Sequence, residues 1–280
     1  LPLEGQVRIC GILNLTPDSF SDGGRFRDVE SAVSAALDLV GDGADWVDVG
    51  GESTRPGHRP VSADEEADRV LPVIRRLRER SDIPISIDTS KAAVADAALS
   101  EGADIVNDVW GTRADPGMAD ICARHGAGVV LMHNRGTAAG TSRPQAEPTE
   151  RETALEFMDS VLRQLEESVA HCLAAGIPET RLVVDPGIGF GISPDQSLAL
   201  LRHLRELDAL GRPVMIGPSR KSFIGAVLGK PVDQRVMGTA AAVACGIQNG
   251  ADFVRVHDVA PMRDIVRLAE AIRGAGHDGT

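Results

Sequence analysis

Seven polar residues stand at the ends of short apolar runs of the sequence or, for Lys221, a few residues beyond one: Asn14, Asp88, Asn107, His133, Asp185, Lys221 and His257. The clearest case is Leu182–Val184, which ends in Asp185 and is followed by Pro186 and Gly187. This pattern predicts a buried parallel strand that delivers one acid to the edge of a sheet. One strand-end Asp or Asn is usually a cap, and one strand-end His is usually structural. Seven such residues around one opening would be costly to bury without a ligand, which favours a binding site.

Asp88, Asn107 and Asp185 form the first chemical set. Their carboxylate and amide groups can pair with a flat ring that carries amino and N–H groups. Buried polar groups of this kind discriminate strongly, because a ligand without the matching partner leaves them unpaired.

Lys221, Arg255 and His257 form a second, cationic set near the C-terminal end of the sequence. In a barrel of parallel strands the last two units often bind phosphate. Arg255 lies inside an apolar run, where a charge needs a partner. The alternative to an anion site is therefore a salt bridge across the barrel, to Asp185 or Asp88.

The elements that position these residues alternate regularly along the chain. We expect strands over Val7–Leu13, Trp46–Val49, Ile83–Ile87, Asp104–Val106, Gly128–Met132, Leu182–Val184, Pro213–Ile216 and Phe253–Val256. Helical spacing of apolar residues follows each of them. Eight such units predict a single (β/α)8 TIM barrel domain over residues 1–280, with the active site at the C-terminal ends of the strands. An open doubly wound sheet ranks second, since no dinucleotide glycine pattern follows the first strand.

Two early loops are rich in Gly, Pro and Ser: Asn14–Gly24, which carries Phe20, and Gly50–Gly57, which carries Arg55. They are candidate lids that close over a second substrate and exclude water. The alternative is ordinary surface loops. A third segment, Arg135–Glu150, is expected to be a long mobile loop.

Composition narrows the function classes. Apolar residues make up 42% and charged residues 25%, which is ordinary for a globular enzyme. The net charge of −12 and the absence of Tyr argue against a nucleic-acid partner. No apolar run reaches the ~18 residues of a membrane span. The first residues show no signal peptide, and the missing Met means that the true N-terminus is not shown.

The four cysteines, Cys10, Cys122, Cys172 and Cys245, lack the spacing of a zinc or redox motif. Cys10 and Cys245 lie in apolar runs and are expected to be buried thiols. A reducing, cytoplasmic location fits this usage best.

The motifs resemble those of one enzyme family. Ile12–Gly24 (ILNLTPDSFSDGG) and Gly50–Gly57 (GESTRPG after Gly50) are similar to the first two signatures of the dihydropteroate synthases. Later motifs match in order: SIDT at 86–89, NDVWG at 107–111, DPGIGF at 185–190, SRKSF at 219–223 and RVHD at 255–258. The resemblance covers essentially the whole chain, and Pro218, where Thr is more usual, is a small departure.

The resemblance implies condensation of 6-hydroxymethyl-7,8-dihydropterin diphosphate with 4-aminobenzoate, which gives 7,8-dihydropteroate and diphosphate for folate synthesis. It implies Mg²⁺ as cofactor and a homodimer formed through helices of the last units. The family is a target of sulfonamides, but the geometry of the loops decides whether they inhibit this protein.

The resemblance also implies a role for individual residues. Pterin binding falls to Asp88, Asn107, Asp185 and Lys221. Diphosphate binding falls to Asn14, Thr54, Arg255 and His257, with Asn14 also at the metal. Aminobenzoate binding falls to Phe20, Arg55, Pro56, Phe190 and Ser222. Lys221, Asp88 and Asp22 are the expected catalytic residues, and Asp22 would help to order the closed first loop.

The expected mechanism is a dissociative, SN1-like displacement, in which a carboxylate such as Asp88 stabilises positive charge on the pterin. A general base is not needed, because the aniline nitrogen attacks while neutral. Two alternatives remain. A methyltetrahydrofolate-type pterin methyltransferase would share the barrel but would not need the two loop motifs. A non-catalytic pterin-binding paralogue would have lost loop or phosphate residues.

Overall fold

Eight short apolar runs form a ring of parallel strands. The computed structural model describes residues 5–15, 29–53, 60–136 and 152–275. The strands are β1 (Arg8–Asn14), β2 (Trp46–Gly50), β3 (Ile85–Asp88), β4 (Ile105–Asp108), β5 (Gly128–Met132), β6 (Leu182–Asp185), β7 (Met215–Ile216) and β8 (Phe253–Val256). They are ordered β6-β5-β4-β3-β2-β1-β8-β7, and a parallel bridge between Val184 and Val214 joins the two ends. The predicted (β/α)8 barrel is therefore confirmed, and the doubly wound sheet is excluded.

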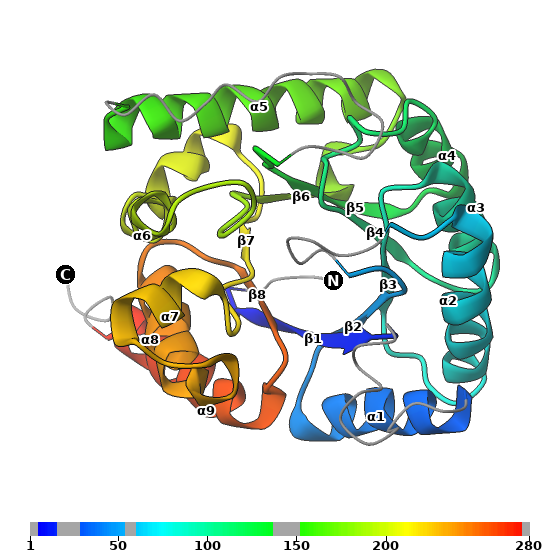
Figure 1. Ribbon diagram of the computed structural model, residues 1–280. Helices are drawn as coiled ribbons and strands as arrows, with labels where there is room; N and C mark the ends of the chain where they lie inside the picture. The colour runs from blue at the N-terminus through cyan, green and yellow to red at the C-terminus, as the bar shows by residue number, and fades with distance from the viewer. Residues whose placement is uncertain (1–4, 16–28, 54–59, 137–151, 276–280) are drawn as a thin grey trace.

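Helices surround the strands, as Figure 1 shows. They are α1 (Val29–Asp42), α2 (Ala63–Arg78), α3 (Ala92–Ser100), α4 (Met118–His125), α5 (Ala154–Ala174), α6 (Pro194–Arg202), α7 (Ser222–Leu228), α8 (Val236–Gln248) and α9 (Val259–Gly274). Each buries an apolar stripe against the outside of the barrel, such as Val70, Ile74 and Leu77 of α2. Among the helices of the described ranges, none is both long and apolar enough to cross a bilayer.

The inside of the barrel is layered along the strands. The lowest layer is apolar and contains Cys10, Trp46, Val130, Met215 and Phe253. The Trp46 and Phe253 rings, at the N-terminal ends of β2 and β8, pack with centroids 5.0 Å apart. Because side chains alternate between the two faces of a strand, the next inward positions come two residues later. The apolar layer thus closes the lower end and leaves the polar layers at the C-terminal end.

Several expected strand boundaries and one expectation about burial were wrong. β7 begins at Met215 instead of Pro213, which has no N–H to donate. β3 begins at Ile85 instead of Ile83, because Pro84 has no N–H to give to a neighbouring strand. Cys245 is exposed, whereas Cys10 is buried as predicted. Residues such as Val243 and Ile247 form the buried face of α8, and Cys245 lies outside that face.

Candidate active site

The C-terminal ends of β1 to β4 bring three predicted site residues into one row. Asn14 pairs with Gly50, Gly50 with Asp88, and Asp88 with Asn107. Gly50 leaves space in this row: a Cβ atom there would lie 3.7 Å from both Asn14 Oδ1 and Asp88 Oδ2. The register of the parallel strands therefore sets the three polar side chains at the same height.

Asp48 forms the floor beneath this row and was missed by the sequence analysis. Its side chain is fully buried, two residues after Trp46 on the inward face of β2. Arg255 Nε donates to Asp48 Oδ2 at 2.6 Å, and Asn107 Nδ2 donates to the same oxygen at 3.1 Å. The Ser86 hydroxyl donates to Asp48 Oδ1. A charged residue inside an apolar strand needs buried partners. The expectation of a partner for Arg255 rests on this requirement, and the same requirement could have identified Asp48.

Arg255 joins the floor to the row above it. Besides Asp48, its guanidinium pairs with Asp88, with Nη2 2.7 Å from Asp88 Oδ2. The salt bridge that was considered as the alternative role of Arg255 is therefore present, with Asp88 as its partner. Burial raises the pKa of Asp88 to about 7, although the Arg255 charge acts to lower it. The Arg255 charge therefore favours the ionised form of Asp88 against the effect of burial.

Asp185 and Lys221 occupy the other side of the opening. Asp185 is 5% exposed, and its Oδ1 accepts a hydrogen bond from the Gly187 N–H at 2.7 Å. Burial raises the pKa of Asp185, while the Lys221 charge lowers it. Burial lowers the pKa of Lys221 to about 8, against the effects of Asp185 and Asp88. The charges of both carboxylates therefore act on the Lys221 ammonium group and oppose the lowering of its pKa.

Phe190 covers Lys221. The Lys221 ammonium lies 4.3 Å from the centroid of the Phe190 ring and donates to the Ile188 carbonyl. A cation over an aromatic face is attracted by the ring quadrupole. The turn after β6 therefore supplies both a carbonyl acceptor and a ring to orient the ammonium group.

His133 supports the turn after Asp185. Its Nδ1 lies 3.1 Å from the Pro186 carbonyl, which can only accept, so this nitrogen carries the proton. Burial lowers the pKa of His133 to about 4, which keeps the ring neutral. Gly187 has φ +75°, and a Cβ atom there would lie 1.8 Å from the His133 carbonyl oxygen. His133 is therefore a buried structural histidine, the usual role of a histidine at a strand end.

The three consecutive side chains of Ser219, Arg220 and Lys221 contact different parts of the protein. The Ser219 hydroxyl lies 3.0 Å from His257 Nδ1, which connects the ends of β7 and β8. Arg220, at φ 57°, turns to Asp258 and forms an ion pair with it. This left-handed residue allows Lys221 to face the barrel while Arg220 faces Asp258. Ser222, the first residue of α7, is exposed.

Several predicted residues lie outside the described ranges. They are Phe20, Asp22, Thr54, Arg55 and Pro56, which belong to the two early loops. Most of the predicted loop Arg135–Glu150 also lies outside them. The pterin set, together with Asn14, Arg255, His257, Phe190 and Ser222, lies within them.

A metal would meet few protein ligands here. In the ranges that the structure describes, there is no cluster of three or more His, Cys, Asp or Glu suited to hold an ion. Mg²⁺ commonly binds through one or two protein oxygens together with substrate phosphates. Asn14 Oδ1, beside the space at Gly50, fits that mode of binding.

Sequence comparison places these motifs in a known family. Residues 10–257 match the family model described as pterin binding enzyme. The dihydropteroate synthase of Bacillus subtilis (strain 168) is 44% identical over 281 residues, which cover 100% of this chain and 94% of that protein.

Solved structures agree with this match. Dihydropteroate synthase of Xanthomonas albilineans with 4-aminobenzoic acid is 42% identical, with a TM-score of 0.88 over 98% of this chain and 96% of that one. The same enzyme in complex with 7,8-dihydropteroate gives a TM-score of 0.85 at 40% identity, with the same coverage of both chains. The Yersinia pestis enzyme with a sulfonamide drug is 38% identical, with a TM-score of 0.88 over 98% and 97% of the two chains. The chain therefore belongs to the dihydropteroate synthase family of pterin-binding enzymes.

Proposed function

We propose that this protein condenses 6-hydroxymethyl-7,8-dihydropterin diphosphate with 4-aminobenzoate, forming 7,8-dihydropteroate and diphosphate for folate synthesis. It would thus be a transferase of the pterin-methyl group. The observation that carries the proposal is the gathering of buried charged groups at the mouth of the barrel, where Arg255 is ion-paired with Asp88 and the charges of Asp185 and Asp88 both act on the pKa of Lys221. Membership of the family and the ligands of its relatives support the same reaction.

Pterin recognition is assigned to Asp88, Asn107, Asp185 and Lys221. The carboxylates accept from ring N–H and amino groups, and the Lys221 ammonium donates to a ring acceptor. Asp185 retains Oδ2 for a ligand while Oδ1 holds the turn at Gly187. The result is recognition of a flat heterocycle by buried groups that stay fixed before the ligand arrives.

The diphosphate is assigned to the opposite end of the ligand, near Asn14, Thr54, Arg255 and His257. Bound Mg²⁺, held in part by the Asn14 amide oxygen, would neutralise charge on the leaving diphosphate. Arg255 adds a fixed cation, and its ion pairs with Asp48 and Asp88 hold the guanidinium in place. Fixed charges need no reorganisation as negative charge develops on the leaving group.

Aminobenzoate is assigned to the outer part of the mouth, beside Phe190 and Ser222 and the loop residues Phe20, Arg55 and Pro56. Asp22 is assigned the role of ordering the first loop around the bound aminobenzoate. Sulfonamides resemble aminobenzoate in shape, so we extend the assignment to them, and the existence of a sulfonamide drug complex of the Yersinia pestis enzyme supports this extension.

The reaction is proposed to be dissociative. Cleavage of the C–O bond leaves positive charge on the pterin, which Asp88 and Asp185 stabilise as carboxylates. The neutral aniline nitrogen of aminobenzoate then attacks the exocyclic carbon, and its proton passes to solvent. Lys221 holds the ring through its charged hydrogen bonds and does not accept a proton.

The Lys221 ammonium predicts a pH dependence. Because burial lowers the pKa of Lys221 to about 8, kcat/KM for the pterin should fall above about pH 8, roughly tenfold per pH unit. The rate should be insensitive to this group below that value, where it is protonated. Initial rates from pH 6 to 10 measure this, and an unchanged kcat/KM up to pH 10 contradicts the role.

Turnover distinguishes the proposed function from its alternatives. The protein is incubated with the pterin diphosphate, Mg²⁺ and labelled aminobenzoate, and labelled dihydropteroate is measured. A pterin methyltransferase gives no labelled product. A non-catalytic paralogue binds the pterin in calorimetry but also forms none.

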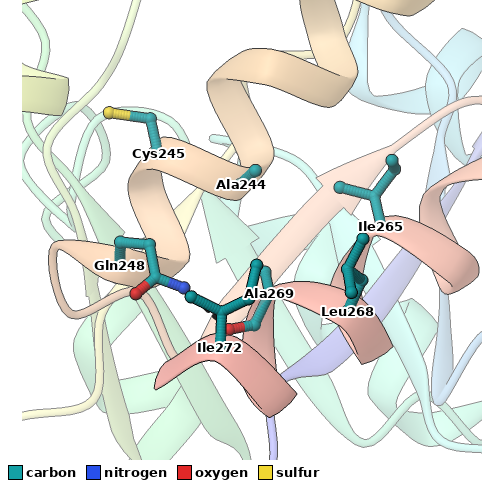
Figure 2. A pocket seen from close by; sticks show the side chains of 7 residues that line it. All are labelled: Ala244, Cys245, Gln248, Ile265, Leu268, Ala269 and Ile272. Atoms are coloured by element: carbon teal, nitrogen blue, oxygen red, sulfur yellow. Dashed lines mark hydrogen bonds between the residues drawn. The ribbon is translucent and has the colours of Figure 1, made fainter. Parts of the chain in front are cut away.

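We propose that the protein is a homodimer through α8 and α9. Figure 2 shows a shallow apolar cavity of about 240 Å³ between these helices, lined in part by Ala244, Ile265, Leu268 and Ile272. Leu268 is 62% exposed and Ile272 is 58% exposed, which is unusual for large aliphatic side chains on neighbouring turns. Light scattering at micromolar concentration tests the proposal, and a mass near the 29.5 kDa of one chain contradicts it.

A further inference from the structure

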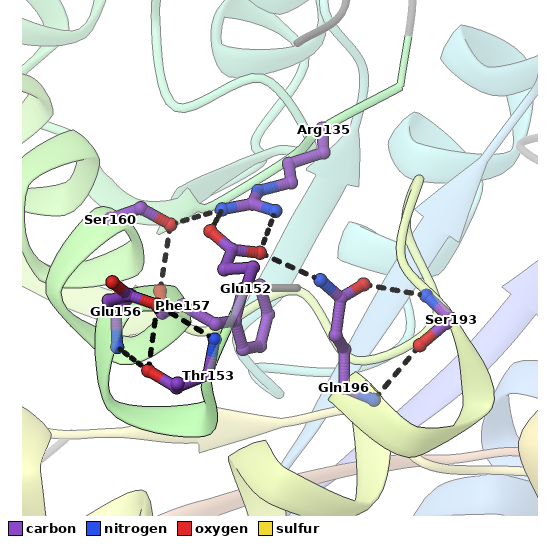
Figure 3. Close-up of polar contacts among 8 residues, drawn as sticks. All are labelled: Arg135, Glu152, Thr153, Glu156, Phe157, Ser160, Ser193 and Gln196. Atoms are coloured by element: carbon purple, nitrogen blue, oxygen red, sulfur yellow. Dashed lines mark hydrogen bonds and ion pairs between the residues drawn. The ribbon is translucent and has the colours of Figure 1, made fainter. Parts of the chain in front are cut away.

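Glu152 connects three parts of the chain beside the mouth (Figure 3). Arg135 follows β5, Glu152 precedes α5, and Gln196 lies in the first turn of α6. Arg135 Nη1 donates to Glu152 Oε2 and Nη2 to Oε1, both at 2.8 Å. Gln196 Nε2 donates to Glu152 Oε2 at 3.0 Å. One carboxylate thus holds both a guanidinium and an amide.

This Glu152 network is stronger than an exposed ion pair. The Arg135 and Glu152 side chains are only 22% and 18% exposed, and the contact is bidentate. The Arg135 guanidinium also lies 4.7 Å from the Phe157 ring centroid and donates to the Ser160 hydroxyl. Hydrogen bonds from Arg135 lower the pKa of Glu152, so the carboxylate is ionised at neutral pH.

The same network reaches the turn that carries Phe190 from two sides. On one side the Arg135 N–H donates to the Phe190 carbonyl at 3.3 Å. On the other side Gln196 forms a capping box with Ser193, three residues after Phe190, through bonds of 2.9 and 3.1 Å. The turn is also packed tightly, since a Cβ atom on Gly191 would lie 2.2 Å from the Gly136 nitrogen.

We propose that Glu152 is a positioning residue for the aminobenzoate site, a statement that rests on the proposed function. By holding Arg135 and Gln196 together, Glu152 fixes both ends of the turn around Phe190. The Phe190 ring then stays over the Lys221 ammonium, where it can form one wall for the benzoate ring. Glu152 itself touches no substrate in this arrangement.

Steady-state kinetics of Glu152→Ala test the proposal. The KM for aminobenzoate should rise about tenfold, the effect of losing roughly one charged hydrogen bond. The KM for the pterin should rise clearly less than that for aminobenzoate, because Asp88 and Asn107 are held by Arg255 and Asp48 and Lys221 keeps its bond to the Ile188 carbonyl. Glu101→Ala is the matched control, since Glu101 makes an equally bidentate pair with Arg75 between α2 and α3. Both KM values of the control should match those of the wild type.

Gln196→Glu provides a second variant that does not depend on the stability of Glu152→Ala. Glu at this position can retain the capping box with Ser193 but repels Glu152. We expect the KM for aminobenzoate to rise while the melting temperature changes little. Equal rises in the KM of both substrates, or none, would overturn the proposal.

A crystal structure of Glu152→Ala separates this inference from the proposed function. The Phe190 ring should move away from Lys221 whether or not the protein makes dihydropteroate. A ring that stays at 4.3 Å from the ammonium overturns the positioning role. Absence of labelled product from the wild type overturns the proposed function alone.

Discussion

Asp185→Asn is expected to weaken binding of the pterin diphosphate by roughly 10- to 100-fold, the range for loss of a hydrogen bond to a charged group. Asp185 is buried, and its Oδ1 is already used by Gly187. Asn has one acceptor oxygen where Asp has two. If that oxygen accepts from the Gly187 N–H, the ligand N–H loses its acceptor, and the reverse also holds. The charge that balances Lys221 is lost as well.

Titration calorimetry with each ligand measures this effect. Phe20→Ala is the contrasting variant, because its predicted contact is with aminobenzoate. It should weaken the use of aminobenzoate and leave pterin affinity near that of the wild type. A similar loss of both ligands in both variants would contradict the division of the site into two parts.

The second large effect is expected for Asp48→Ala, which should lower the free energy of unfolding by about 3–5 kcal/mol. The substitution leaves Arg255, Asn107 and Ser86 without the buried acceptor that they share. Within the part of the chain that the structure describes, Asp88 would then be the remaining carboxylate that forms an ion pair with Arg255. Asp48→Asn should cost less, because its amide oxygen still accepts a hydrogen bond.

Urea denaturation checks this prediction. The control is Asp96→Ala, which removes surface contacts with Arg124 and His125 and should change the free energy of unfolding by at most about 1 kcal/mol. If Asp48→Ala unfolds at the same urea concentration as the control, then Asp48 does not hold the floor of the site.

The strand ends could be predicted from the sequence because their signals are local. Asp88, Asn107 and Asp185 each follow an apolar run and precede turn-forming or polar residues. This local pattern is enough to place each residue at the end of a strand, and the parallel order of the strands is enough to place all three at the same edge of the sheet. The parallel register then places Asn14, Asp88 and Asn107 side by side. Boundaries shifted by one or two residues did not affect this result.

Contacts between distant segments could not be predicted in the same way. Asp48 and Arg255 are 207 residues apart, and their contact depends on β1 lying between β2 and β8. Glu152 bonds both Arg135 and Gln196, which lie in two other segments of the chain. No periodicity in the sequence indicates that these three segments meet. Cys245 was wrongly expected to be buried because an apolar run does not show which face of a helix is outermost.

The apolar layer beneath Asp48 has a spectroscopic consequence. The chain has no Tyr and two Trp, so its near-ultraviolet emission comes almost entirely from Trp46 and Trp110. Trp46 lies against Phe253 below the carboxylate floor, while the indole of Trp110 lies near Gly136, beside Arg135. The molecule therefore contains two intrinsic fluorophores at different heights, Trp46 at the closed lower end of the barrel and Trp110 after the C-terminal end of β4. Single-tryptophan variants can report separately on each of them, without an added dye.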